Sequence, residues 1–259
     1  MDHTARREML YYFAPGRRLF QIVVKIADKP GSLGRVLNLL GTRVNLVGMT
    51  SYVISDDAVI ASGFAEPLSQ NETAAKLRSL ILSSGVAQDV EVLEGRDGML
   101  VDAFHTGLET GGEHLILVRR RALTQMLNVV VKLLGSGGEV VLFQEGMAIG
   151  RANGEAFVRS LGVEKVRENI GYLSDNLAAQ GWGRVAVEAS PDRETLRILI
   201  RDCFECSSDE GARTSCNFFR GYIVGNGSVT FRKEFVVEET KCRLRGDDAC
   251  EFLARAKTL

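Results

Sequence analysis

The order of strand-like and helix-like segments in the first 94 residues is the feature that most restricts the fold. Residues 19–27, LFQIVVKIA, are dense in apolar and β-branched side chains and end at the breaker DKPG, which predicts a strand and a turn. The pattern then predicts helix, strand, strand, helix and strand over residues 31–41, 44–54, 58–65, 71–83 and 86–93. This βαββαβ order folds most simply as a four-stranded antiparallel sheet with both helices on one face, the ferredoxin-like sandwich.

Apolar residues at three- and four-residue steps identify the two helices of this half. They give each helix one apolar face, and Gly41 supplies a stop for the first helix. Between the two central strands, Ser55-Asp56-Asp57 suits a tight hairpin turn. The expected inward-facing residues are Leu33, Val36, Leu37 and Leu40 in the first helix, and Ala75, Leu77, Leu80 and Ile81 in the second.

A polar, glycine-rich segment at residues 94–98, EGRDG, predicts a domain boundary. We therefore expect a first domain over residues 17–95 and a second over residues 99–256. Helical spacing recurs in the second at residues 118–135, 143–162 and 163–181, and each segment ends in glycine. After Trp182 the pattern predicts strands at residues 183–190 and 195–203 and a long strand at 229–242. Both halves are thus predicted to be α+β.

Charge and hydropathy exclude several functional classes. The 32 basic and 33 acidic residues give a net charge of −1, so no long-range field attracts the whole molecule to nucleic acid or to an anionic membrane. Three consecutive arginines, Arg119 to Arg121, are more typical of a solvated helix face than of a nucleic-acid reader. The apolar runs are too short for a membrane span, and the N-terminus lacks the pattern of a secretory signal, so we expect an intracellular, cytoplasmic protein.

The turn between the first strand and helix has the features of an anion-binding site. Pro30 and Gly31 allow a tight turn that leaves backbone N–H groups at a helix N-terminus. The sequence IADKPGSLGRVLNLL followed by VNLVGM resembles the ACT domain, a small regulatory fold, from residue 19 to about residue 94. This resemblance implies an amino-acid-type effector and self-association, in which a neighbouring subunit completes the site. The same turn also serves folding alone, and many such domains only dimerise. The matching positions are Asp28, Gly31, Ser32, Leu33 and Asn45.

All five cysteines lie in the last quarter of the chain, beginning at Cys203. In a reducing compartment an odd number of cysteines favours metal or redox chemistry over a disulfide framework. A series C-x22-E-x2-C-x7-C combines three soft thiolate ligands with one carboxylate, which suits a tetrahedral zinc site. A turn, RGDDA, lies between its last two cysteines and can bring them together on a hairpin. Free cysteines are also common as small core residues, and the glutamate could instead pair with Lys241. The four residues of the series are Cys216, Glu239, Cys242 and Cys250.

The wider sequence, CNFFRGYIVG and then EETKCRLRGDDACEF, resembles the 4-vinyl-reductase domain from about residue 115 to residue 252. That domain is found in phenol-sensing activators and in archaeal proteins predicted to bind hydrocarbons. The resemblance implies a structural zinc ion on the four residues named above and an apolar pocket beside it. A shell closed by four protein ligands leaves no position for an activated water, so hydrolysis at this metal is not expected.

Other residues of the second half leave alternatives open. Cys203 and Cys206 form a C-x-x-C, which suits a redox pair, a second metal half-site or two buried small residues, and we favour an accessory role. The glycines of GMAIGRANG, residues 146–154, favour close helix packing. His114 and Trp182 are candidates for the apolar pocket, although both residue types are more often structural.

We expect a ligand-sensing regulatory protein without catalytic activity. Its expected partners are a small apolar or aromatic molecule, an amino acid at the first domain, and a second copy in a homodimer. One alternative is an enzyme or accessory component of porphyrin vinyl-group reduction, although the chain has no G-x-G-x-x-G between a strand and a helix. The other is a scaffold, because the second half also resembles the fold of vesicle-tethering subunits.

Overall fold

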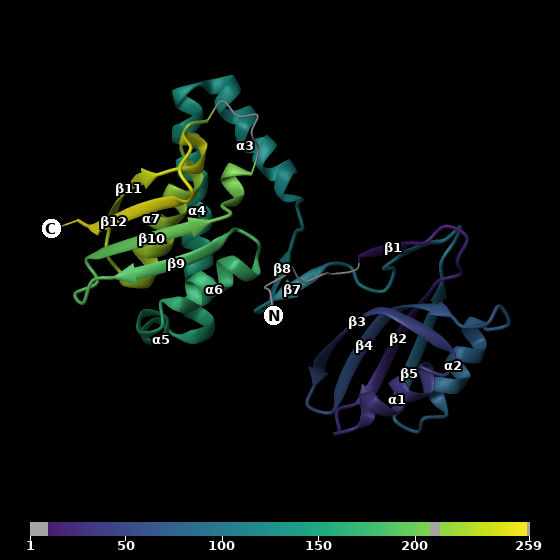
Figure 1. Ribbon diagram of the computed structural model, residues 1–259. Coiled ribbons are helices and arrows are strands. Elements are labelled where there is room, and N and C mark those ends of the chain that lie inside the picture. Colours follow the sequence, from purple (N-terminus) through teal and green to yellow (C-terminus); the bar gives the residue numbers. More distant parts are fainter. Residues whose placement is uncertain (1–9, 208–212, 258–259) are drawn as a thin grey trace. The chain divides into compact units, whose positions relative to one another are not determined.

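The computed structural model describes residues 10–207 and 213–257, and the chain divides into two compact units between Leu108 and Glu109 (Figure 1). Each unit has its own four-stranded antiparallel sheet and its own hydrophobic core. The predicted α+β class is therefore confirmed.

The first unit contains the predicted βαββαβ order. Its sheet has the strand order β3-β4-β2-β5, and every neighbouring pair is antiparallel. The elements are β1 (Tyr11–Phe13), β2 (Phe20–Ala27), α1 (Ser32–Leu40), β3 (Val44–Ser55), β4 (Ala58–Pro67), α2 (Ala74–Leu82), β5 (Ala87–Glu94) and β6 (Met99–Val101).

Apolar side chains of α1 and α2 join those of the sheet in one core. Val36 and Leu40 of α1, and Leu77 and Ile81 of α2, are buried there as the spacing predicts. The α2 helix starts after Thr73, whose side-chain oxygen accepts a hydrogen bond from the Lys76 N–H at 3.3 Å. The expectation that Ala75 faces inward is wrong, because this residue is exposed and Ala74 packs against the core instead.

The first unit continues past the boundary that the sequence predicts at residues 94–98. Strand β6 returns along β1, so residues beyond the glycine-rich segment still belong to this unit. Two further contacts fasten the chain after β6. The buried Gln21 amide donates to Asp102 Oδ1 at 2.6 Å, and Asp102 Oδ2 lies 2.7 Å from His105 Nδ1. The division therefore lies about ten residues later than predicted.

The second unit places its helices on one antiparallel sheet, with strand order β11-β12-β10-β9. Helix α7 packs on β11 and β12, and α4 packs on α7, while α6 contacts β9 (Figure 1). The elements are β7 (Leu108–Thr110), β8 (Glu113–Leu115), α3 (Arg120–Leu134), α4 (Ser136–Leu161), α5 (Val163–Glu168), α6 (Gly171–Ala179), β9 (Arg184–Ala189), β10 (Thr195–Arg201), the 3-10 turn η1 (Phe204–Cys206), α7 (Asn217–Phe231), β11 (Phe235–Lys241), the 3-10 turn η2 (Arg243–Arg245) and β12 (Cys250–Ala256). Strand β7 begins one residue before the division between the units.

Glycines on both helices bring the backbones of α4 and α7 into close contact. A Cβ atom at Gly146 or Gly150 would collide with backbone carbonyls of α7, and one at Gly221 or Gly225 with carbonyls of α4. Gly154 also faces α7. Close packing is therefore the confirmed role of the glycines at residues 146–154.

The predicted long strand at residues 229–242 is wrong in its first part. Helix α7, which the pattern did not indicate, continues to Phe231 and ends at Arg232 in the left-handed region, with a φ of 53°. Strand β11 begins only at Phe235. The β-branched and aromatic residues of this stretch favour a strand locally, but packing against α4 overrides that preference.

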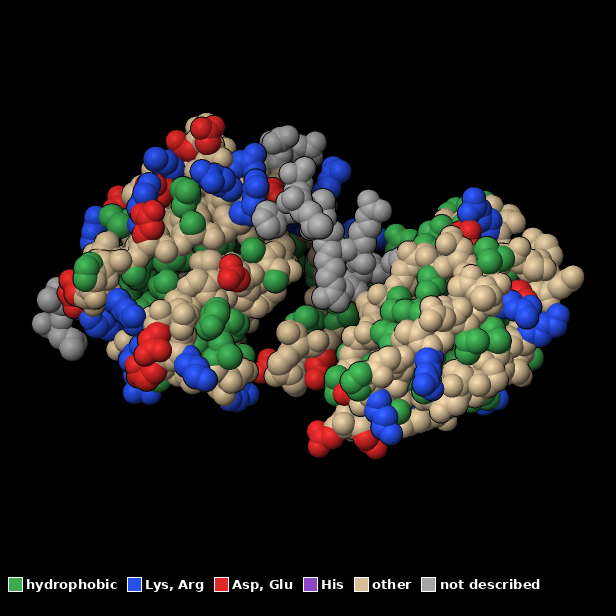
Figure 2. All heavy atoms as spheres, turned by 60° about the horizontal axis from the view of Figure 1, so that its bottom comes forward, with side chains coloured by type: hydrophobic (Ala, Val, Ile, Leu, Met, Phe, Trp, Pro, Cys, Tyr) green, Lys and Arg blue, Asp and Glu red, His purple; other side chains and the backbone are tan. Residues whose placement is uncertain are grey.

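None of the helices in the described part of the chain has the length and apolar character of a membrane span. On the face shown in Figure 2, acidic and basic side chains are interspersed rather than gathered into a field of one sign. This distribution agrees with the net charge of −1.

Candidate metal centre and apolar cavity

The second unit brings all five cysteines together, and every one is buried with a free thiol. Cys203 and Cys206 lie at η1, Cys216 directly precedes α7, Cys242 follows β11, and Cys250 begins β12. The turn between the last two is held by Asp247, whose carboxylate accepts the Cys242 N–H at 2.7 Å. The predicted hairpin therefore forms and presents its two thiols to the start of α7.

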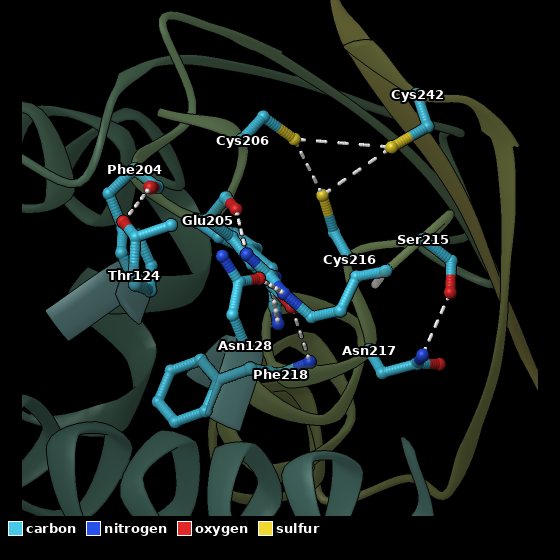
Figure 3. A network of polar contacts seen from close by, with 12 residues as sticks. Thr124, Asn128, Phe204, Glu205, Cys206, Ser215, Cys216, Asn217, Phe218 and Cys242 are labelled. Atoms are coloured by element: carbon cyan, nitrogen blue, oxygen red, sulfur yellow. Dashed lines mark hydrogen bonds and ion pairs between the residues drawn. The ribbon is translucent and has the colours of Figure 1, made fainter. Parts of the chain in front are cut away.

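Four of the sulfur atoms lie at the mutual distances expected around a single metal ion. Cys206 Sγ lies 3.1 Å from that of Cys216, 3.4 Å from that of Cys250 and 4.0 Å from that of Cys242 (Figure 3). Cys216 Sγ lies 3.7 Å from the sulfurs of both Cys242 and Cys250. Zinc–sulfur bonds of about 2.3 Å in a tetrahedron place sulfurs about 3.8 Å apart, so the cluster can hold one metal ion.

The predicted ligand set is one of two groups whose ligand atoms all lie within 4.8 Å of one another. It comprises Cys216, Glu239, Cys242 and Cys250. The second group consists of Cys203, Cys206, Cys216 and Cys250. The C-x-x-C pair, for which the spacing indicated only an accessory role, thus lies inside the cluster.

Interactions among the thiols separate their pKa values. Hydrogen bonds with Cys203, Cys206 and the other thiols lower the pKa of Cys250, so it ionises first. The same neighbours, Cys203 first, raise the pKa values of Cys206 and Cys216. Because one thiolate disfavours the next, a bound cation is the means by which several thiolates can coexist here.

A buried ion pair holds the chain between the second and third cysteines. The side chains of Glu205 and Arg213 are 0% and 1% exposed, and Arg213 Nη1 lies 3.0 Å from Glu205 Oε1. Glu205 also accepts the N–H groups of Phe218 and Phe219, at 3.1 and 2.8 Å, in the first turn of α7. Burial raises the pKa of Glu205 to about 7, although Arg213 opposes the shift.

Helix α3 supplies the wall on the other side of this segment (Figure 3). Thr124 Oγ1 donates to the carbonyl of Phe204 at 2.9 Å, and Asn128 Oδ1 accepts from Arg213 Nε at 2.6 Å. Sequence reasoning missed these polar residues, because a lone acid, threonine or asparagine in a helical or loop pattern carries no distinguishing spacing.

An apolar cavity of about 60 Å³ lies between α6, α7 and strands β9 and β10. Aliphatic and aromatic side chains form most of its wall, and the start of α7 contributes Phe219, Tyr222 and Ile223. Polar side chains in the lining are those of Ser174, Tyr222 and Asn226. Ser174 is 7% exposed, and its Oγ has no hydrogen-bond partner among the described residues.

The predicted pocket residues His114 and Trp182 do not line this cavity. His114 lies exposed on β8, in a short hairpin. Trp182 packs in an aromatic cluster, with its ring 4.8 Å from that of Tyr222 and 6.0 Å from that of Phe219. Trp182 therefore contacts the cavity wall from behind.

In the first unit, the five predicted effector residues do not meet within one chain. Asp28 to Leu33 lie where β2 turns into α1, and Gly31 precedes the helix with a φ of 86°. Asn45 pairs with Glu66, whereas Ala27 pairs with Ala58 at the opposite end of β4. Eight residues of strand separate these positions by roughly 25 Å, at about 3.3 Å per residue.

A model of the 4-vinyl-reductase domain matches residues 196–256, which contain both 3-10 turns, α7, and all five cysteines. Curated relatives include uncharacterized proteins of Methanocaldococcus jannaschii. One, MJ0150, is 28% identical over 135 residues, covering 52% of this chain and 74% of the relative. Another, MJ0745, is 37% identical over 60 residues, covering 23% of this chain and only 33% of the relative.

Three solved structures resemble part of the chain at TM-scores below 0.5, too low to add to the assignment. The phenol-responsive sensory domain of the transcription activator PoxR is 20% identical, with a TM-score of 0.47, over 56% of this chain and 78% of that one. A trafficking protein particle complex subunit 3 of Naegleria fowleri has 16% identity and a TM-score of 0.41, over 54% and 95% of the chains. A vinyl-4-reductase family protein of Methanocaldococcus jannaschii has 16% identity and a TM-score of 0.39, over 56% and 85%. From the family match, the C-terminal unit contains a 4-vinyl-reductase domain.

Proposed function

We propose that the C-terminal unit is a non-catalytic sensor that binds a small apolar or aromatic molecule in the cavity between α6, α7 and the sheet. One observation carries the proposal: helix α7 lines the cavity and also begins at the cysteine cluster. A zinc ion on the cluster would fix the start of α7, and with it the cavity wall. The metal thus has a structural role, while the ligand is recognised by the apolar lining.

The size of the cavity makes ligand entry a conformational event. A cavity of about 150 Å³ accommodates benzene, so 60 Å³ holds only part of such a ring. The sheet and the glycine-packed pair of α4 and α7 are rigid boundaries, whereas α6 contributes the remaining wall. Binding would therefore displace α6, and this displacement is the signal that a partner could read.

The polar groups of the lining define the kind of ligand. A buried hydroxyl without a partner loses free energy that a ligand group can restore by hydrogen bonding. Ser174 provides such a hydroxyl in an otherwise apolar wall. The preferred ligand is accordingly an apolar or aromatic body that carries one hydrogen-bonding group.

The composition of the lining also supports binding without turnover. Carboxylate, imidazole and thiol groups, which serve as general acids, bases and nucleophiles, do not occur among the described lining residues. Burial raises the pKa of Tyr222, so its hydroxyl remains protonated and acts as a hydrogen-bonding group.

Binding of p-cresol and toluene tests the ligand class, because the two molecules differ by one hydroxyl group. Trp182, the one tryptophan of the chain, contacts Phe219 and Tyr222 of the cavity wall, so its fluorescence should change on binding. We expect p-cresol to bind more tightly than toluene, by up to about tenfold. Ser174→Ala should remove this preference, whereas Ser136→Ala, on an exposed residue of α4, should keep it.

Absence of a fluorescence change and of thermal stabilisation with both probes and with longer aliphatic ligands would contradict the sensor. Reduction of a vinyl substrate with an added reductant would replace it with the enzyme alternative. A tightly retained lipid that does not exchange would favour the scaffold.

We further propose that the first unit is an ACT-type regulatory module with an amino-acid effector. The turn before α1 supports this proposal, because Gly31 directs the chain so that free N–H groups begin the helix. The separation of Asn45 from that turn requires a second subunit to complete the site. Calorimetry with the standard amino acids, with and without p-cresol, tests the coupling, since each ligand must then alter the affinity of the other. Independent binding would leave two uncoupled modules.

A further inference from the structure

The cysteine cluster contains more ligand atoms than one tetrahedral metal can use. Five thiols and the Glu239 carboxylate compete for four positions. We propose that Cys206 is the fourth metal ligand, beside Cys216, Cys242 and Cys250, and that Glu239 remains outside the metal shell. The inference rests on the metal-binding part of the proposed function and specifies the residues that perform it.

The position of Cys206 is the first argument. Its sulfur lies within 4.0 Å of the sulfurs of Cys216, Cys242 and Cys250, and those three lie within 4.8 Å of one another. These distances bracket the spacing of about 3.8 Å in a tetrahedral zinc–sulfur site. A metal ion could therefore enter the cluster with only small movements of the four side chains.

The surroundings of Glu239 are the second argument. Both of its carboxylate oxygens lie 3.2 Å from the Cys216 backbone N–H, and Oε2 lies 3.7 Å from the guanidinium of Arg245. A carboxylate satisfied in this way serves better as an acceptor that orients the Cys216 backbone. Outer partners of this kind are common around metal ligands.

The anchoring of Cys206 is the third argument. The adjacent Glu205 is bound to Arg213 and to two N–H groups in the first turn of α7, the helix that Cys216 precedes. Cys206 is therefore fixed relative to Cys216 by buried, charge-assisted hydrogen bonds. The positive end of the α7 dipole also lies at the cluster and favours thiolate ligands.

Cys203 provides the matched control. Its sulfur groups with those of Cys206, Cys216 and Cys250, but that group does not contain Cys242. Cys203 and Cys206 are both buried cysteines of one C-x-x-C, so replacing either removes one thiol from the same short segment.

X-ray absorption spectroscopy of the full-length zinc-loaded protein tests the proposal directly. We expect a shell of four sulfurs, and three sulfurs with one oxygen would overturn the assignment without any variant. A protein that binds no metal at all would instead refute the metal-binding part of the proposed function, which ligand binding to the cavity tests separately.

Chelator competition with the variants identifies the fourth sulfur. Cys206→Ser should weaken zinc binding at least about tenfold. Cys203→Ser should leave both the affinity and the four-sulfur shell unchanged, and Glu239→Gln should retain four sulfurs. In the cobalt-loaded protein, Cys206→Ser should lower the thiolate-to-metal charge-transfer absorbance, whereas Glu239→Gln should not. The reverse pattern, or a metal lost with Cys203→Ser but not with Cys206→Ser, would overturn the assignment.

Discussion

At the scale of single residues, one methyl group at Gly150 should destabilise the C-terminal unit. The added Cβ would meet the backbone carbonyl of Tyr222 on α7, and a helix backbone cannot move aside as a flexible side chain can. Gly150→Ala should therefore lower the free energy of unfolding by at least about 1–3 kcal/mol, measured by urea denaturation. Gly137→Ala is the control, since its Cβ enters open space on the same helix, and it should stabilise by about 0.5–1 kcal/mol. Equal effects of the two substitutions would contradict the packing role.

Residue spacing predicted part of the cluster and missed the rest for a physical reason. Cys216, Cys242 and Cys250 could be grouped because a hairpin and a turn bring them together locally. The position of Cys206 depends on the buried pair of Glu205 and Arg213, which is a tertiary interaction without sequence periodicity. Trp182 was placed at the cavity from its residue type alone, and the structure puts it one layer behind the wall.

At the scale of elements, helix α7 should depend on the metal. Cys216 directly precedes the helix, and the binding free energy of a structural metal contributes to folding. Chelation under reducing conditions should lower the hydrogen-exchange protection of α7 and β12 and leave α1 and α2 unchanged as an internal reference. Cys242→Ser should have the same effect. Unchanged protection of α7 and an unchanged melting temperature after complete metal removal would show that the metal is not structural.

The same helix shows why element prediction failed between residues 217 and 231. The segment contains three glycines, three phenylalanines and several β-branched residues, all weak helix formers. Its glycines are required by contact with α4, and that contact supplies the stability that the local sequence lacks. In α1 and α2 local spacing and tertiary packing agree, and both helices were predicted near their true bounds.

At the scale of the whole molecule, we expect self-association through the first unit. Strand β3 is an edge strand of 12 residues, and Tyr52, Val53 and Ile54 on it are 42%, 64% and 46% exposed. An exposed apolar edge favours pairing with another copy. Light scattering should show a dimer or larger at micromolar concentration, and Val53→Lys should shift the protein towards monomer. A wild-type monomer would contradict both this expectation and an effector site shared between subunits.

The division into two units was predictable, but its position was not. The long segments of the βαββαβ order carry clear periodicity, whereas β1 and β6 are three-residue strands whose pairing leaves no pattern. A glycine-rich turn inside the first unit therefore produced the same signal as a linker.

The strand order of the second sheet also determines when this unit can fold during synthesis. Strand β12 lies between β10 and β11, so the sheet has no continuous centre until residue 256 has left the ribosome. Cys250, at the start of that strand, is likewise the last thiol of the cluster to be made. The first unit has all its strands by then and can fold during translation, whereas the metal-binding unit must acquire its ion and its tertiary structure almost together at the end.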